Sequence, residues 1–211
     1  MSLQNRVTPS GRLESTSARG AWLGNRGILH NKDKKIVSPW KHQAWVTCKL
    51  NYKGIKRDIF SPNKYSELFF IDEVTALSAG HRPCGGCRKV RYNEFKLAWC
   101  NANLDNAVNN ISITTIDKKL HAERAIRGGE KVTYNEVFEK LPAGTFISIN
   151  TVPHLIWDNK IYPWTHYGYN KPISAIPLNK IVEVLTPVSI VIMFKKGFIP
   201  QVHPSICNES I

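Results

Sequence analysis

The segment with the clearest potential for chemistry is His81-Arg-Pro-Cys-Gly-Gly-Cys-Arg88. Two thiols three residues apart can chelate one soft divalent ion if the turn between them is tight. Gly85 and Gly86 favour such a turn because glycine tolerates positive φ angles. The spacing therefore predicts a metal knuckle at Cys84 and Cys87, with zinc as the expected metal. A redox dithiol has the same spacing, but it usually accompanies a βαβ pattern, which is not evident here.

Two further residues are candidates to complete the metal site. His81 lies three positions before Cys84, close enough for both side chains to wrap one ion. Cys48 lies in the segment 43–52, where apolar and polar residues alternate as in a β-strand. The alternation places Cys48 on the apolar face, so the residue is either a small buried core side chain or a metal ligand.

The segment Leu68–Arg88 resembles the second half of the Ada-type zinc-binding domain. In that family an aromatic strand leads to a short helix and then to an aromatic-Arg-Pro-Cys-x-x-Cys turn. The resemblance implies a four-cysteine zinc site and DNA binding of the DNA-repair type. The chain departs from the family upstream, where Cys48 stands alone in place of a Cys-x-x-x-Cys pair, and at His81, where the family has an aromatic residue. The family's methyl-acceptor role is therefore not carried over.

A second pattern, His121-Ala-Glu123, is similar to a motif of the zinc-dependent base deaminases. In those enzymes a His and the two cysteines of Pro-Cys-x-x-Cys hold zinc, while the Glu moves protons for the zinc-bound water. The resemblance implies a nucleobase deaminase, or another nucleic-acid hydrolase, with His121 and Glu123 as catalytic residues. The order is reversed here, however, because His121 follows the cysteines. An exposed His and Glu on a charged helix is the alternative.

The charge of the chain indicates a polyanionic partner. Among 211 residues, 29 are Lys or Arg and 16 are Asp or Glu, which leaves a net charge of +13. Residues 1–60 hold twelve of the basic and three of the acidic residues, a net of +9. Such a field favours nucleic acid, DNA rather than RNA, although a non-catalytic basic RNA-binding module is an alternative. The candidate contact residues are Arg19, Arg26, Trp40, Lys41, Arg82, Arg88, Lys89 and Arg91.

Composition narrows the class of protein further. With 42% hydrophobic and 21% charged residues, the chain is neither mainly disordered nor collagen-like nor a coiled coil. The start of the chain lacks the apolar run of a signal peptide, and no apolar stretch is long enough to span a bilayer, so no membrane partner is expected. Five cysteines, an odd number, argue against a disulfide framework. We therefore expect a cytoplasmic protein.

The elements that must position these residues indicate an α+β fold. We expect residues 1–20 to form a flexible basic arm, residues 21–130 a metal-knuckle region that binds nucleic acid, and residues 131–211 a small β-rich region with a terminal helix. The β-rich half reads as a small antiparallel, barrel-like sheet. A strand is expected over 67–71. Helices are expected over 73–78 with Asp72 as the N-cap and Gly80 as the stop, and over 88–101, 116–126, 134–141 and from 187 to about 195. Thr133 with Glu136 forms a capping-box pattern at the start of the helix expected over 134–141.

Overall fold

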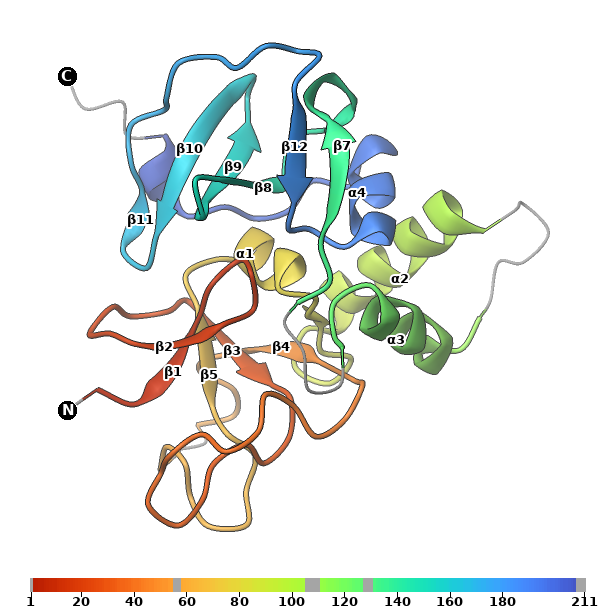
Figure 1. Cartoon of the computed structure of the whole chain (residues 1–211). Coiled ribbons are helices and arrows are strands. Elements are labelled where there is room, and N and C mark those ends of the chain that lie inside the picture. Colours follow the sequence, from red (N-terminus) through yellow and green to blue (C-terminus); the bar gives the residue numbers. More distant parts are fainter. Residues whose placement is uncertain (1, 55–57, 105–110, 127–130, 208–211) are drawn as a thin grey trace.

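The computed structural model describes residues 2–54, 58–104, 111–126 and 131–207, and it confirms an α+β fold (Figure 1). The first of two six-stranded sheets has the order β2-β1-β5-β3-β4-β6. Its pairs are antiparallel except β1 with β5 and β4 with β6, which are parallel. The strands are β1 (Gln4–Val7), β2 (Leu13–Ser15), β3 (Trp22–Asn25), β4 (Val46–Lys49), β5 (Leu68–Phe70) and β6 (Arg82–Pro83).

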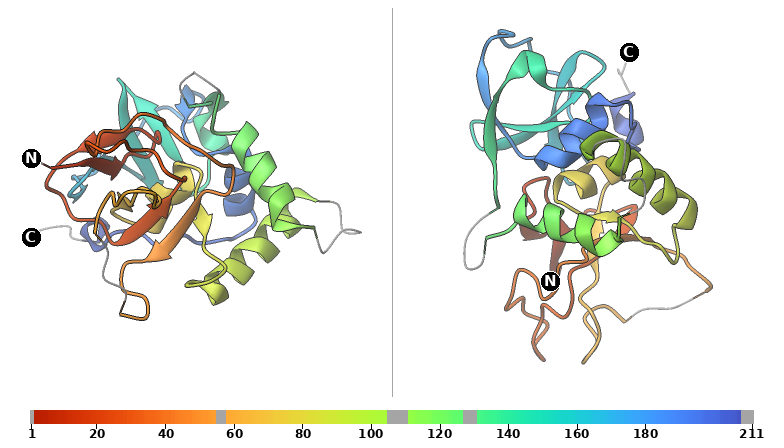
Figure 2. Two further views of the ribbon diagram at one scale, coloured as in Figure 1. Left: turned by 90° about the horizontal axis from the view of Figure 1, so that it is seen from below. Right: turned by 90° about the vertical axis from the view of Figure 1, so that its right-hand side faces the viewer.

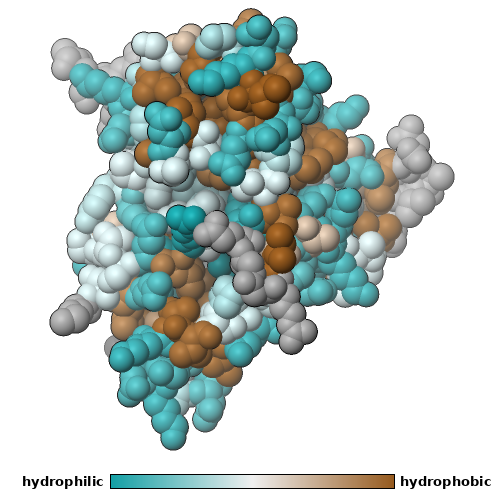
Figure 3. Space-filling view, viewed as in Figure 1, coloured by the Kyte–Doolittle hydropathy of each residue, from teal (hydrophilic) through white to brown (hydrophobic). Residues whose placement is uncertain are grey.

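The second sheet is formed by the C-terminal part of the chain and is antiparallel throughout, in the order β11-β10-β9-β8-β12-β7. Among the described residues its two edge strands do not pair with each other, so the sheet is open and the expected barrel does not close. Figure 3 shows hydrophobic residues gathered on the face of this sheet that is seen in Figure 1. Its strands are β7 (Tyr134–Val137), β8 (Phe146–Ile149), β9 (Val152–Trp157), β10 (Lys160–Thr165), β11 (Gly168–Tyr169) and β12 (Ile181–Val184). Short 3-10 turns are η1 (Phe138–Lys140) and η2 (Pro204–Ile206).

Helix α1 (Glu73–Ser78) lies between the two sheets, and all six of its residues are buried (Figure 1). The predicted N-cap is confirmed, because an Asp72 carboxylate oxygen accepts a 2.9 Å hydrogen bond from the Thr75 N–H. Val74 packs into the core of the second sheet, and Ala76 into that of the first. Leu77 belongs to a third core, which the other helices form. The short helix thereby joins the two halves into one packed body.

Helices α2 (Lys89–Asn103), α3 (Ile113–Ala122) and α4 (Val188–Lys195) gather on one side of the molecule (Figure 2). The core that they share contains Phe95, Trp99, Ile116, Leu120, Ile190 and Met193. The helices predicted over 88–101 and from 187 to about 195 are confirmed as α2 and α4. Helix α3 begins and ends earlier than predicted, because Ser112 caps it by accepting a hydrogen bond from the Thr114 N–H.

The helix predicted over 134–141 is wrong. Tyr134–Val137 forms strand β7 instead and pairs residue by residue with Ile181–Val184 of β12. The Thr133 hydroxyl, expected to cap a helix, donates to the Glu183 carboxylate at 2.9 Å. A complete ladder of backbone hydrogen bonds to a neighbouring strand outweighs a local capping pattern, because helix propensity is a weak preference that tertiary pairing overrides.

The first twenty residues also differ from the expected arm. Residues 4–7 and 13–15 pair with each other as β1 and β2, and β1 joins the sheet through β5. Val7 packs in the core of the first sheet, which explains why this segment is part of the fold.

All five cysteines are free thiols. Within the described residues, no helix is long and apolar enough to cross a membrane.

Candidate metal centre and its surroundings

The thiols of Cys48, Cys84 and Cys87 converge, with their sulfur atoms all within 4.8 Å of one another. Their meeting follows from the parallel pairing of β4 with β6, in which Thr47 lies opposite Pro83. The residue after each of these two is a cysteine, and the Cys84 N–H donates to the Thr47 carbonyl at 2.9 Å. This register brings Cys48 to the predicted knuckle, so the structure places it with the candidate ligands and not in the core.

The turn between Cys84 and Cys87 leads directly into α2, and the Arg88 N–H donates to the Cys84 carbonyl at 3.1 Å. Neither Gly85 nor Gly86 has a positive φ, so the predicted reason for these glycines is wrong. The backbone of this turn instead donates a hydrogen bond to sulfur, from the Gly86 N–H to the Cys84 Sγ at 3.4 Å. The Lys49 N–H makes a similar contact of 3.4 Å to the Cys87 Sγ. Such N–H donors stabilise negative charge on sulfur.

The thiols are polarised against one another. The pKa of Cys84 is lowered to about 4, chiefly because the Cys48 thiol donates a hydrogen bond to its sulfur, with further donation from backbone N–H groups. The pKa of Cys48 is correspondingly raised, first by that hydrogen bond and then by burial. The hydrogen-bond donors around Cys84 therefore favour its thiolate form, which is the form that binds metals.

Three of the predicted nucleic-acid contacts are instead engaged inside the protein. Arg82 forms a two-pronged ion pair with Asp117, with both N–O distances at 2.7 Å. Arg88 donates to Thr47 and to Glu73, and its guanidinium carbon lies 3.8 Å from the Trp22 ring. Arg91 also pairs with Glu73, at 2.7 Å. These arginines hold the knuckle on α1 and α3 and are not available for phosphate contacts.

His81 is not a member of the cysteine cluster, contrary to expectation. The ring is buried, and its Nε2 accepts a 3.2 Å hydrogen bond from the Arg26 Nε. It packs against Phe70 and Trp45, with ring centroids 4.7 and 5.2 Å away. Burial, together with the positive charges of Arg26 and Arg124, holds the pKa of His81 well below its ordinary value. His81 is therefore a neutral core side chain.

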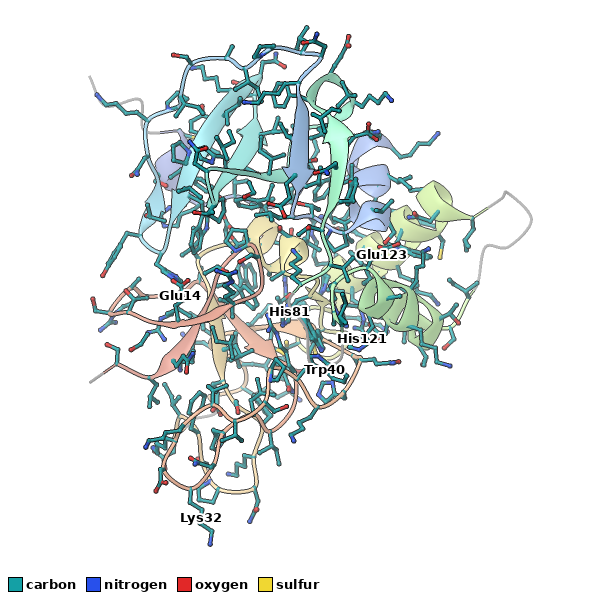
Figure 4. All side chains as sticks on the ribbon, in the orientation of Figure 1. Glu14, Lys32, Trp40, His81, His121 and Glu123 are labelled. Carbon is teal, nitrogen blue, oxygen red and sulfur yellow. The ribbon has the colours of Figure 1, made fainter. Side chains whose placement is uncertain are left out.

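The deaminase arrangement is not assembled among the described residues. His121 packs edge-on against Trp40, with ring centroids 4.5 Å apart, and the metal-capable group contains cysteines only. Figure 4 shows His121 beside Trp40, with Glu123 further along toward the helices. Glu123 accepts hydrogen bonds at 3.1 and 2.6 Å from the backbone and hydroxyl of Ser189, in the first turn of α4. The carboxylate thus caps a helix.

This capping role predicts a moderate loss of stability in a Glu123→Ala variant. The substitution leaves the first turn of α4 without its acceptor, so we expect the free energy of unfolding to fall by about 1–2 kcal/mol. Urea denaturation measures the change. Glu139→Ala is the matched control, because Glu139 is exposed and its replacement is expected to cost less than about 0.5 kcal/mol. Equal stability of the two variants, with loss of any ammonia release from nucleobases in the first, would instead support a catalytic role.

The remaining predicted residues divide between the surface and the interior. Arg19, Lys41 and Lys89 are exposed, while Arg26 is 2% exposed. Arg26 and the half-buried Trp40 line a cavity between the two sheets, and Arg124, Lys131 and Trp45 line the same cavity. Sequence reasoning missed Arg124 and Lys131 because each resembles an ordinary surface cation, whereas Arg26 and Trp40 of the same cavity were among the predicted contacts.

No protein-family model, curated protein or solved structure matches this chain.

Proposed function

We propose that the protein binds zinc and engages nucleic acid, DNA in preference to RNA, in DNA processing or repair. The observation that carries the proposal is that three cysteine sulfurs lie within 4.8 Å of one another in a strongly basic chain. The two segments that supply the thiols, residues 41–54 and 80–93, contain no Asp or Glu. The resemblance of Leu68–Arg88 to the Ada-type domain supports DNA as the partner.

The donor set fits zinc. Thiolate sulfurs are among the ligands that zinc prefers, and they suit it better than magnesium or calcium, which prefer oxygen. Cys48, Cys84 and Cys87 would hold the ion, and it would link β4 to the start of α2. Among the described residues the group offers three side-chain ligands, so a fourth position is open to water or to a group of the bound partner. When bound, zinc supplies a structural cross-link in a small region with short strands.

Exposed lysines next to the knuckle are the proposed phosphate contacts. Lys49 and Lys89 follow Cys48 and Cys87 closely in sequence, and both side chains are exposed. Lys53 is exposed as well, on the loop after β4. Arginines 82, 88 and 91 are paired with the carboxylates of Asp117, Glu73 and Glu94, so the exposed lysines are the proposed source of positive charge on this face. Lysine contacts to phosphate release counterions, and the affinity must therefore fall as salt increases.

Charge reversal at Lys49 and Lys89 tests this face. We expect the double variant Lys49→Glu, Lys89→Glu to bind a 20-base-pair DNA at least about tenfold more weakly than the unmodified protein near 100 mM salt. The slope of log affinity against log salt should fall by about 2, since two phosphate contacts are lost. Fluorescence anisotropy with labelled DNA and RNA of the same sequence measures both quantities.

The matched control is Lys195→Glu, Lys196→Glu, which makes the same change in charge at the exposed end of α4. An equal loss of affinity in the two double variants would assign the binding to net charge and not to the knuckle face. Binding to RNA as tight as to DNA would favour the RNA-binding alternative. Metal analysis of the purified protein is expected to find one zinc ion per chain.

A further inference from the structure

A cavity of about 620 Å³ lies between the two sheets, apart from the cysteine cluster. Its walls come from the loop between β1 and β2, the loop before β4, the end of α3, and the strands β8, β9 and β12 of the second sheet. Its volume lies within the range of pockets that bind small organic ligands. In Figure 4, Trp40, His81 and His121 mark this region, close to α3.

Among the described residues, four basic side chains line the cavity: Arg12, Arg26, Arg124 and Lys131. The last three are anchored by backbone carbonyls. Arg26 donates from Nη1 to the Gly11 carbonyl at 2.9 Å. Arg124 donates to the carbonyls of Gly80 and Gln43. Lys131 donates to the carbonyls of Pro9, Ser78 and Leu185. These contacts orient the cations, but carbonyl groups carry no net charge to balance them.

Within the described part of the chain, Arg26, Arg124 and Lys131 make no salt bridge. Asp117 and Glu123 act on Arg124, and Glu183 acts on Lys131, only through their charge and without direct ion pairs. In addition, the Nη2 of Arg26 and the Nε of Arg124 are buried without a hydrogen-bond partner, and each of these side chains is 2% exposed. Unpaired buried charge is costly and is ordinarily matched by an opposite charge. An anion in the cavity would supply the missing partner.

The pKa values of Arg26 and Arg124 reflect their burial and their closeness to each other. Burial lowers the pKa of Arg26 to about 9. The pKa of Arg124 is also lowered to about 9, first by burial and then by the positive charge of Arg26. The two guanidinium carbons each lie 4.2 Å from the Trp45 ring, so one indole holds both cations in place. Two arginines fixed in this way present forked donors, which match the geometry of phosphate oxygens.

Aromatic surface adjoins the cationic end of the cavity. Trp40 is half-buried, lines the cavity and is braced by the edge of His121. An exposed part of an indole ring offers a planar face on which a nucleic-acid base can stack. Hydroxyl groups in the wall add hydrogen-bonding partners, from Ser10, Ser38, Thr133, Ser148 and Thr151. Among the described residues of the wall, the one carboxylate is that of Glu183, which already accepts a hydrogen bond from Thr133.

We propose that this cavity binds one nucleotide unit, with its phosphate at Arg26 and Arg124 and its base against Trp40. The unit is either a free nucleoside monophosphate or the phosphorylated end of a strand, since both present the same dianionic phosphate beside a base. The site is distinct from the lysine face next to the cysteine cluster, and it goes beyond the proposed function by specifying a pocket for a single nucleotide.

The first test uses the unmodified protein. Thermal unfolding is followed with each of the four deoxynucleoside monophosphates, with the matching nucleosides and with inorganic phosphate. At a ligand concentration of about 100 times Kd, a monophosphate should raise Tm by about 5–10 °C, while the nucleosides raise it by much less. Inorganic phosphate should give a smaller rise than the monophosphates. A Tm that none of these ligands raises would overturn the proposal and leave the cations as anchors of loops.

Variants then separate the phosphate from the base. Arg26→Met should weaken binding of the monophosphate at least about tenfold, measured by calorimetry. Lys41→Met is its matched control, because it removes a neighbouring exposed cation that is not in the cavity wall, and it should leave the affinity unchanged. Trp40→Leu should weaken the monophosphate about tenfold but leave inorganic phosphate unaffected. An Arg26→Met protein that binds as tightly as the control would contradict the proposal, as would a Trp40→Leu effect equal for both ligands.

Arg26 is buried, so its replacement can unfold the protein; in that case Trp40→Leu and Arg26→Lys, which keeps the charge but not the forked donors, decide the outcome. The affinity of Arg26→Lys for the monophosphate should lie between that of the unmodified protein and one tenth of that value. Oligonucleotides with and without a 5′-phosphate distinguish a strand end from a free nucleotide. Lys49→Glu, Lys89→Glu should bind the monophosphate normally, so that failure of the lysine face and failure of the cavity give different results.

Discussion

A Cys84→Ser variant is expected to lose its zinc and to melt about 10 °C below the unmodified protein. Cys84 is the central thiol of the cluster. The pairing of β4 with β6 places it next to Cys48, and the short turn places it next to Cys87. A metal that binds only the folded chain stabilises it by about 4 kcal/mol when its free concentration is about 1,000 times Kd. For a chain of this size, that corresponds to a change in Tm of about 8–16 °C.

The matched control is Cys207→Ser, which removes an exposed thiol outside the cluster. It should keep one zinc ion and the melting temperature of the unmodified protein. A chelator should lower the Tm of the unmodified protein and of this control, but not that of Cys84→Ser. Calorimetry with metal analysis of each sample measures these results. A Cys84→Ser protein with full zinc content and unchanged Tm would contradict the metal site.

Replacing Glu73 by Gln is expected to lower the free energy of unfolding by about 3–5 kcal/mol. Glu73 is fully buried at the start of α1, and its oxygens bind Arg88 at 2.5 Å and Arg91 at 2.7 Å. It also accepts the Gln201 N–H at 3.0 Å, which ties the C-terminal segment to the knuckle. The variant leaves the buried Arg88 without its counter-charge, which is the costly way to break a buried ion pair. Urea denaturation measures the loss.

The same residue makes stability depend on pH. Burial by itself raises the pKa of Glu73, but the hydrogen bonds and charges of Arg91 and Arg88 outweigh it and hold the pKa below its usual 4.5. Because the folded pKa is the lower one, the stabilisation is complete above about pH 4.5 and is lost as the pH falls through the folded value. The difference in stability between the unmodified protein and Glu73→Gln should therefore shrink below pH 4.5.

The control for both measurements is Glu94→Gln. Within the described residues its carboxylate pairs with Arg91 alone, at 2.9 Å, and the side chain is half exposed, so we expect a change of less than about 0.5 kcal/mol. A loss of stability as large as that of Glu73→Gln would show that pairing with Arg91, and not burial, is what matters.

Several predictions that depend on neighbouring residues in the chain were confirmed. The strand ending at Phe70, the cap by Asp72 and the helix that follows are set by residues within one turn of each other. Gly80 ends this segment with a φ of +86°. The pairing of Cys84 with Cys87 depends on one short turn. Local hydrogen bonds and steric limits on φ act over a few residues, so they can be read without the fold.

Predictions that depended on distant partners failed or stayed open. The capping pattern at Thr133 gave way to pairing of β7 with β12, a strand nearly fifty residues later. Arg82 and Arg88 were predicted as surface cations, but in the structure they form ion pairs with Asp117 and Glu73. A charge pattern describes how many cations a chain has, but burial and pairing decide which of them face solvent.

The amino-acid sequence alone determined the α+β class, the basic character of the chain and two of the three candidate metal ligands, because composition and short-range spacing carry that information. Only the tertiary structure decided that Cys48 joins the cluster, since a one-residue change in the β4–β6 register would have turned its side chain to the other face of the sheet. It also decided that Arg26, Arg124 and Lys131 meet around one cavity. These cations come from segments about a hundred residues apart, and long-range packing against Trp45 and the backbone carbonyls brings them together.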